Sequence, residues 1–185
     1  MGRPALTRLM RDTGETALLG VLDGEADKAI YVDVVESDNP VRYTVPCGDR
    51  RELYCSAVGK CFLAFFDDAA IARYLERHTL IPHTRRTLTR PDELRAELRR
   101  VRRSGVAISD EERVEGASAV ASAVLSAEGR PLAALVIGAP SARFRAHRAR
   151  YSALVKAAAA ELSSMLGMSR GPAASPKASV HREVG

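Results

Sequence analysis

Small residues and a Gly-Lys pair lead directly into an apolar run within residues 53–66. The stretch reads Leu-Tyr-Cys-Ser-Ala-Val-Gly-Lys-Cys-Phe-Leu-Ala-Phe-Phe, so a helix is expected to begin near Ser56. The first backbone N–H groups of a helix have no partner inside the helix and attract anionic or carbonyl groups of a ligand. The segment therefore predicts ligand binding by the amides of Ala57, Val58 and Gly59. Close packing of a helix on a sheet also requires small residues and accounts for the same pattern.

Three consecutive acidic residues, Asp110, Glu111 and Glu112, follow a short apolar segment. Paired carboxylates can carry acid–base chemistry or bind a metal ion. Because no histidine lies near them in the sequence, a solvated turn is the favoured interpretation. No catalytic residue is assigned.

Cysteine and histidine spacing gives no metal motif. Cys47, Cys55 and Cys61 are separated by eight and six positions, which match neither CxxC nor a common zinc pattern. His78 and His83 flank a Leu-Ile-Pro loop, where surface positions are expected. The sequence therefore predicts reduced, unpaired thiols, no metal site and no cofactor.

The densest cluster of basic residues in the chain consists of eight arginines between residues 85 and 103. These are Arg85, Arg86, Arg90, Arg95, Arg99, Arg100, Arg102 and Arg103. Phosphate binding is one interpretation. Interleaved glutamates and the absence of aromatic residues favour a solvated amphipathic helix instead.

Length and composition are those of one globular domain. The 185 residues are 46% hydrophobic and 28% charged, with a formal net charge of +5 and no Trp. No window approaches the roughly 20 apolar residues that a membrane helix needs, and the N-terminus lacks the apolar core of a signal peptide. A cytoplasmic protein without membrane contact is expected.

Hydrophobic periodicity and turn residues predict an α+β fold. Six strands are expected at 16–22, 29–35, 41–45, 106–108, 117–126 and 132–137. Helices are expected at 4–13, 56–66, 68–77, from a Thr89 cap to Gly105, and at 146–166. The order indicates a six-stranded antiparallel sheet with helices packed on it. Residues 169–185, rich in Ser, Pro, Ala and charge, are expected to form a disordered tail.

Three motifs in this order resemble the effector-binding domain of IclR-type transcriptional regulators. They are Ser-Ala-Val-Gly-Lys-Cys-Phe-Leu-Ala at 56–64, the segment 105–112 followed by Gly116, and Pro-Leu-Ala-Ala-Leu-Val-Ile-Gly-Ala-Pro at 131–140. The resemblance implies a GAF-like fold, with a linker helix at 1–14 and an effector-binding domain at 15–168. It also implies a small-molecule effector and a homodimer or tetramer. Such regulators carry a winged helix-turn-helix ahead of this domain, so DNA contact is expected only through a domain absent from this chain.

The resemblance also implies a set of effector-binding positions on both sides of the pocket. They are Tyr43, Arg51, Ala57, Val58, Ser109, Ala117, Ala119, Val136 and Gly138. Ser109 stands where members that bind small carboxylic acids have an acidic residue, and Ala119, Val136 and Gly138 replace Cys or Ser types. Each lost hydrogen bond to an effector removes about 0.5–1.5 kcal/mol. A mostly apolar organic ligand, aromatic or carboxylic, is therefore expected, with Arg51 and Tyr43 as polar groups.

Glu52 and Tyr54 depart from the pattern of this family, which usually has Pro and His at these positions. The favoured hypothesis is an effector-sensing domain that controls DNA binding through a partner domain, and it requires no catalytic residue. An alternative is a stand-alone domain turned into a biosynthetic enzyme that uses the same pocket. Its chemistry would come from Cys55, Tyr43, Arg51, Asp110 or Glu111. A third is a dimerisation module that modulates full-length relatives.

Overall fold

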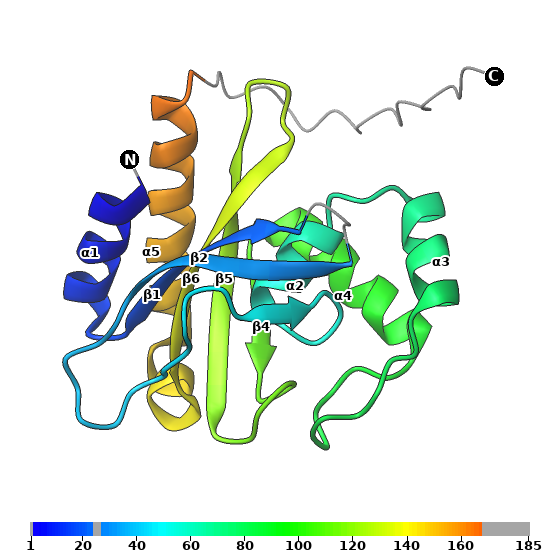
Figure 1. The fold of residues 1–185 in the computed structure, drawn as a ribbon, viewed down its shortest axis with the longest axis horizontal. Helices are drawn as coiled ribbons and strands as arrows, with labels where there is room; N and C mark the ends of the chain where they lie inside the picture. The colour runs from blue at the N-terminus through cyan, green and yellow to red at the C-terminus, as the bar shows by residue number, and fades with distance from the viewer. Residues whose placement is uncertain (1, 24–26, 168–185) are drawn as a thin grey trace.

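Five helices and six strands make up the computed structural model, which describes residues 2–23 and 27–167 (Figure 1). The elements follow the order α1 (Gly2–Thr13), β1 (Thr16–Leu22), β2 (Lys28–Val35), β3 (Arg50–Glu52), α2 (Ala57–Leu63), α3 (Asp68–Arg77), α4 (Pro91–Ser104), β4 (Ala107–Asp110), β5 (Ala117–Leu125), β6 (Pro131–Pro140) and α5 (Ser141–Met165). The strands form one antiparallel sheet in the order β3-β2-β1-β6-β5-β4. The predicted α+β class and the six-stranded antiparallel sheet are confirmed.

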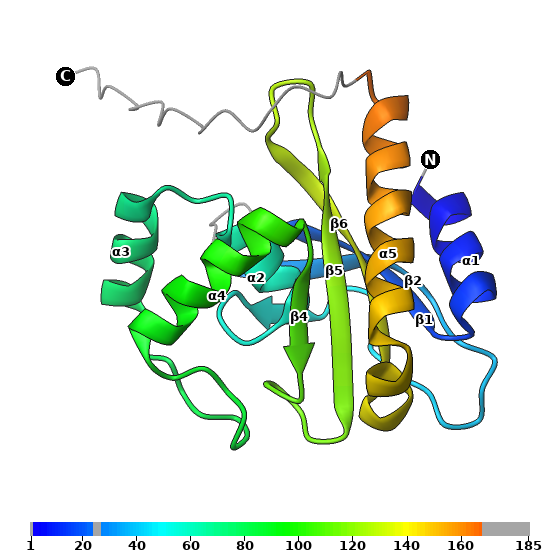
Figure 2. The same ribbon diagram turned by 180° about the vertical axis from the view of Figure 1, so that it is seen from behind.

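Alternating side chains divide the core between the two faces of the sheet. On β1, Ala17 belongs to the cluster under α1 and α5, whereas its neighbour Leu18 belongs to the cluster that contains α2 and α4. The same alternation runs along β6, where Leu135 lies in the first cluster and Val136 in the second. Figure 2 shows α1 and α5 side by side over one face of the sheet. The other face, closed by α2, holds the candidate site.

The third expected strand is wrong in position. Residues 41–45 are irregular, and the strand that pairs with β2 is Arg50–Glu52, with Ala29 opposite Arg51. A turn at Gly48 (φ 89°) brings this strand alongside β2, and the Gly48 N–H donates to the Tyr31 carbonyl. The alternating Val-Tyr-Val pattern at 41–45 instead reflects a segment that lies on the sheet, where the Thr16 hydroxyl donates to the Tyr43 carbonyl at 2.6 Å.

Several helix starts also differ from the sequence expectation, and α1 begins two residues early, at Gly2. Helix α4 begins at Pro91 after Arg90, and within the described chain no side chain caps it, so Thr89 is not the cap. Helix α5 begins at Ser141, five residues earlier than expected. None of the helices in the described ranges has both the length and the apolar character needed to cross a bilayer. The expected tail at 169–185 lies outside the described residues.

Candidate functional site

The start of α2 is held tightly against the loop that precedes it. Ser56 caps the helix: its hydroxyl accepts from the Gly59 N–H at 3.1 Å and donates to the Glu52 carbonyl at 2.7 Å. A side chain at Gly59 would place its Cβ 2.7 Å from the Leu53 carbonyl oxygen, so the close approach requires glycine. Gly59 is therefore required by its close approach to residues 52–53, and its amide, one of the three predicted ligand donors, is already bonded to Ser56. Ligand binding by the Ala57 and Val58 amides stays a prediction.

A cavity of about 30 Å³ lies between the start of α2, the sheet and the loop after β4. This volume holds about two water molecules. Six of the nine predicted positions line it: Tyr43, Arg51, Ala57, Ser109, Ala117 and Ala119. Five further residues that the sequence did not indicate complete the wall: Tyr31, Ser56, Arg113, Val114 and Ser118. Four of these five are polar residues, but most of the surface that lines the cavity is apolar.

The three remaining predicted positions lie behind the cavity wall rather than on it. Val136 is fully buried in β6. Val58 is fully buried and packs on Gly20, since a Cβ on this glycine would lie 2.5 Å from Val58 Cγ2. Gly138 is covered by the ring of Tyr43, because a Cβ built there would lie 2.9 Å from Tyr43 Cε1. The space that Gly138 leaves is therefore occupied by an aromatic ring of the same chain.

Arg51 supplies positive charge at the cavity and lies close to the side chains of Tyr31 and Tyr43. Its guanidinium forms an ion pair with Asp49 and lies 5.9 Å from the centre of the Tyr31 ring. Within the described chain, the buried Arg51 Nε has no hydrogen-bond partner. Burial raises the pKa of Tyr31 and the pKa of Tyr43, and the nearby Arg51 only partly opposes this. Both phenols therefore stay neutral at physiological pH, and Arg51 retains a free donor.

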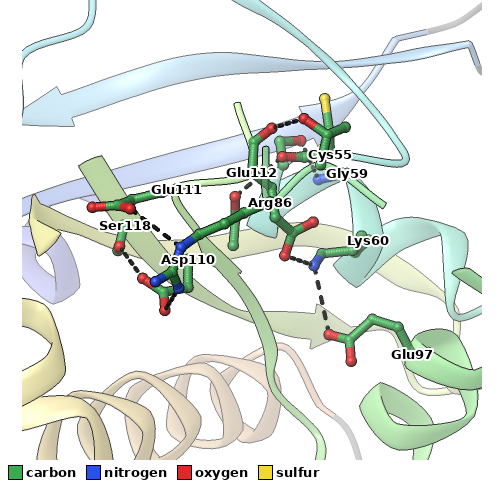
Figure 3. Close-up of polar contacts among 12 residues, drawn as sticks. Cys55, Gly59, Lys60, Arg86, Glu97, Asp110, Glu111, Glu112 and Ser118 are labelled. Carbon is green, nitrogen blue, oxygen red and sulfur yellow. Dashed lines mark hydrogen bonds and ion pairs between the residues drawn. The ribbon is translucent and has the colours of Figure 1, made fainter. Parts of the chain in front are cut away.

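Asp110 and Glu111, candidates for acid–base chemistry, are held by arginines at the end of β4. Arg145 lies 3.0 Å from an oxygen of each carboxylate, and Arg86 lies 3.0 Å from Asp110. Figure 3 shows Asp110 between Ser118 and Arg86. Burial raises the pKa of Asp110, but hydrogen bonds from Arg145 and Ser118 outweigh it and lower the pKa overall. Among the described residues that line the cavity, none is a carboxylate, thiol or imidazole, and the titratable side chains there are two tyrosines and two arginines.

Glu112, the third acidic residue, forms a buried ion pair that the sequence did not predict. Its Oε1 lies 2.5 Å from the Nζ of Lys60, a fully buried side chain in α2, and Glu97 of α4 lies 3.5 Å from the same nitrogen (Figure 3). Burial raises the pKa of Glu112, and the Lys60 ammonium opposes this shift. The solvated-turn interpretation is therefore wrong for Glu112. Lys60 joins α2, α4 and the loop that carries Arg113.

Glu52, Cys55 and His83 bring metal-ligating atoms within 4.8 Å of one another. Burial, followed by the Glu52 charge, raises the pKa of the Cys55 thiol to about 12. Cys61 is also buried, whereas Cys47 is exposed, and all three thiols are free. The spacing argument missed this group because His83 comes from a separate loop, where a single histidine carries no pattern.

The family described as "Bacterial transcriptional regulator IclR C-terminal" matches residues 1–164. This chain belongs to the IclR C-terminal domain family. It is 34% identical over 168 residues to the acetate operon repressor of Salmonella typhimurium, and 32% identical over 165 residues to the transcriptional repressor IclR of Escherichia coli. These alignments cover 90% and 89% of this chain, but only 61% and 60% of the two repressors. The chain thus spans about three fifths of the length of these IclR-type relatives.

Solved structures of IclR-type proteins share this fold. The Thermotoga maritima IclR structure superposes with a TM-score of 0.83 and 32% identity over 90% of this chain and 67% of that one. The C-terminal domain of the Escherichia coli regulator KdgR superposes with a TM-score of 0.78 and 31% identity, covering 89% of this chain and 95% of that domain. The resemblance predicted from the three motifs is confirmed, and so is the fold that it implied.

Proposed function

We propose that this chain senses a small organic effector and controls a transcriptional regulator of which it forms the C-terminal part. The observation that carries the proposal is the cavity beside α2, whose wall combines Arg51, Arg113, two tyrosines and three serines from separate segments. The serine hydroxyls donate within the chain, so Arg51 and the apolar part of the wall are left to orient a mostly apolar acid.

Arg51 is the residue expected to hold a carboxylate of the effector. Its guanidinium can form two parallel hydrogen bonds with a carboxylate, and its Nε has no hydrogen-bond partner within residues 2–23 and 27–167. The cavity is small, at about 30 Å³, and an organic acid that extends toward β6 would require a side chain to move. Tyr43 is that side chain, because its ring covers the bare backbone of Gly138. An apolar part of the ligand would replace the ring there, consistent with a mostly apolar carboxylic effector.

Hydrogen bonds connect the segment of Tyr43 to the end of α1. The Tyr43 carbonyl accepts from Thr16 at 2.6 Å, and the Gly14 carbonyl accepts from Ser37 at 2.5 Å and from Asn39 at 2.8 Å. A ligand that displaces Tyr43 would therefore also disturb the junction between α1 and β1. Helix α1 is the predicted linker at 1–14, which leads toward a DNA-binding domain in this proposal. The contacts provide two sites and a physical connection between them, as allosteric control requires.

The remaining expectations follow from membership in a family of transcriptional regulators. We infer an effector-binding domain at 15–168, a homodimer or tetramer, DNA binding through a separate domain, and a cytoplasmic location. Light scattering coupled to size-exclusion chromatography measures the oligomeric state. A monomer at micromolar concentration would contradict that part of the proposal.

A ligand panel with two matched arginine variants tests the binding proposal. Thermal unfolding is measured with aromatic and aliphatic carboxylic acids, and a binder is expected to raise the midpoint because it binds only the folded state. Arg51→Gln should abolish the shift. Arg50→Gln, which removes a mostly exposed neighbour that pairs with Asp23, should leave the shift unchanged. No shift with any acid, or an undiminished shift in Arg51→Gln, would refute the proposed carboxylate site.

A further inference from the structure

Three side chains of the kinds that bind transition metals converge beside the cavity. Glu52 ends β3, Cys55 lies in the loop before α2, and His83 lies in the loop between α3 and α4. One ligand atom from each lies within 4.8 Å of the other two, and Cys55 Sγ is 4.0 Å from Glu52 Oε2. Cys55 is buried and His83 is exposed, so the group has both a closed side and an entry path from solvent.

The hydrogen bonds of His83 determine which ring nitrogen is free to bind a metal. The Tyr54 hydroxyl has a single proton, which it donates to the Ile81 carbonyl at 2.8 Å. At 3.1 Å from His83 Nε2, the same hydroxyl must therefore accept, which assigns the ring proton to Nε2. His83 Nδ1 keeps its lone pair. A histidine whose other nitrogen is held by a hydrogen bond is the usual form of a metal ligand.

A positive charge already occupies the space between these ligands. Arg113 Nε lies 3.0 Å from Glu52 Oε2, and Arg113 Nη1 lies 3.2 Å from His83 Nδ1. The side chain is 29% exposed, so it can swing into solvent. The site thus attracts a cation, and its present occupant has a buried Nε without an aligned hydrogen bond among the described residues.

We propose that Glu52, Cys55 and His83 bind one zinc ion, which displaces Arg113. A carboxylate oxygen, a thiolate and the His83 Nδ1 lone pair are three ligands of the set that zinc prefers, with solvent in the fourth position. Thiolate and imidazole select zinc over calcium or magnesium. The Cys55 proton passes to solvent on binding, so the two anionic ligands balance the dication. Ligand atoms around tetrahedral zinc lie about 3.5 Å apart, which requires the three side chains to close by roughly 1 Å.

Metal binding would also change the effector cavity, because Arg113 lines both sites. With zinc bound, Arg113 no longer pairs with Glu52 and is released toward the cavity rim or solvent. The two proposals fail separately: without the metal site Arg51 is still in place to bind a carboxylate, and without Arg51 the three metal ligands are still in place.

Titration of the whole chain with Zn²⁺ against a chromophoric chelator tests the site, and Co²⁺ reports the thiolate by its charge-transfer absorption. One ion per chain is expected. Cys55→Ser and His83→Gln should each weaken binding by about 10–100-fold or more, the loss typical even for residues that only support a ligand. Cys47→Ser, at an exposed thiol outside the group, should bind as the parent does.

Arg113→Gln provides the sharpest measurement, because a site elsewhere on the protein would not respond to it. Removal of the competing cation should tighten Zn²⁺ binding. Circular dichroism and thermal unfolding of each variant without metal establish that it is folded. The absence of binding by the parent, undiminished affinity in Cys55→Ser, or weaker affinity in Arg113→Gln would each overturn the assignment.

Discussion

Substitution of Gly138 by alanine should expel the Tyr43 ring from the sheet. The built Cβ lies 2.9 Å from Tyr43 Cε1, 3.0 Å from Cγ and closer still to Cδ1, all below normal contact distance. Gly138 pairs with Thr16 and Ala119 in the middle of the sheet, so its backbone cannot yield easily. The Tyr43 ring must move instead. Overpacking of this kind costs about 1–3 kcal/mol of unfolding free energy.

A double-mutant cycle isolates this contact. Alanine in a strand is intrinsically more stable than glycine by about 0.5–1 kcal/mol, so Gly138→Ala should be mildly stabilising once Tyr43→Ala has removed the ring. The two backgrounds should therefore differ by about 1–3 kcal/mol in the effect of the same substitution. Urea unfolding of the parent, both single variants and the double variant measures this coupling energy.

Amide hydrogen exchange gives a second measurement of the same event. Because the Tyr43 carbonyl accepts from Thr16, displacement of the ring should loosen residues 37–45 and raise their exchange rates in Gly138→Ala. If the effects of Gly138→Ala and Tyr43→Ala on the unfolding free energy add within about 0.5 kcal/mol, the reasoning is refuted. Additivity would show that the new Cβ at position 138 does not meet the Tyr43 ring. Unchanged exchange at 37–45 would refute the proposed link between the cavity and α1.

Three further predictions concern buried charge. Lys60→Met should lower the unfolding free energy by about 3–5 kcal/mol, because it leaves the buried Glu112 carboxylate without its cation. As a control, Lys156→Met at an exposed site should change the unfolding free energy by about 0.5 kcal/mol or less. Chemical denaturation measures both values. Burial raises the pKa of Glu112 in the folded chain above its usual value of 4.5. Between pH 4.5 and the raised pKa, the folded chain therefore binds more protons than the unfolded chain. The free energy of unfolding should fall as the pH rises through this range. Glu112→Gln should therefore gain stability relative to the parent as pH increases from 4.5, and a flat difference between their pH–stability curves would contradict this. Arg143→Ala should lower the unfolding free energy by about 1–3 kcal/mol, because it removes the hydrogen bonds of 2.6 and 2.9 Å to Glu15, which is only 1% exposed. An unchanged melting temperature would contradict this prediction.

Local pattern predicted most of the fold and failed where long-range contacts took over. The apolar β-type runs at 16–22 and 29–35 identified two strands because their side chains enter the core, on both faces of the sheet in the case of β1. The alternation at 41–45 was misleading, because Tyr43 points inward to contact Gly138 and its segment forms no strand. Similarly, the acidic run at 110–112 has no periodicity that separates Glu112, which is buried, from Asp110, which faces arginines on the surface.

The sequence by itself determined the family, the order of the elements and six of the eleven residues that line the cavity. These properties depend on side-chain periodicity, on glycine and on short motifs, all of which are local in the chain. Only the tertiary structure decided that Tyr43 fills the space above Gly138, that Lys60 pairs with Glu112, and that His83 approaches Cys55. Each of these contacts joins segments far apart in sequence, as in the 52-residue separation of Lys60 and Glu112. Their geometry follows from how α2 and the loops pack on the sheet, which no local pattern encodes.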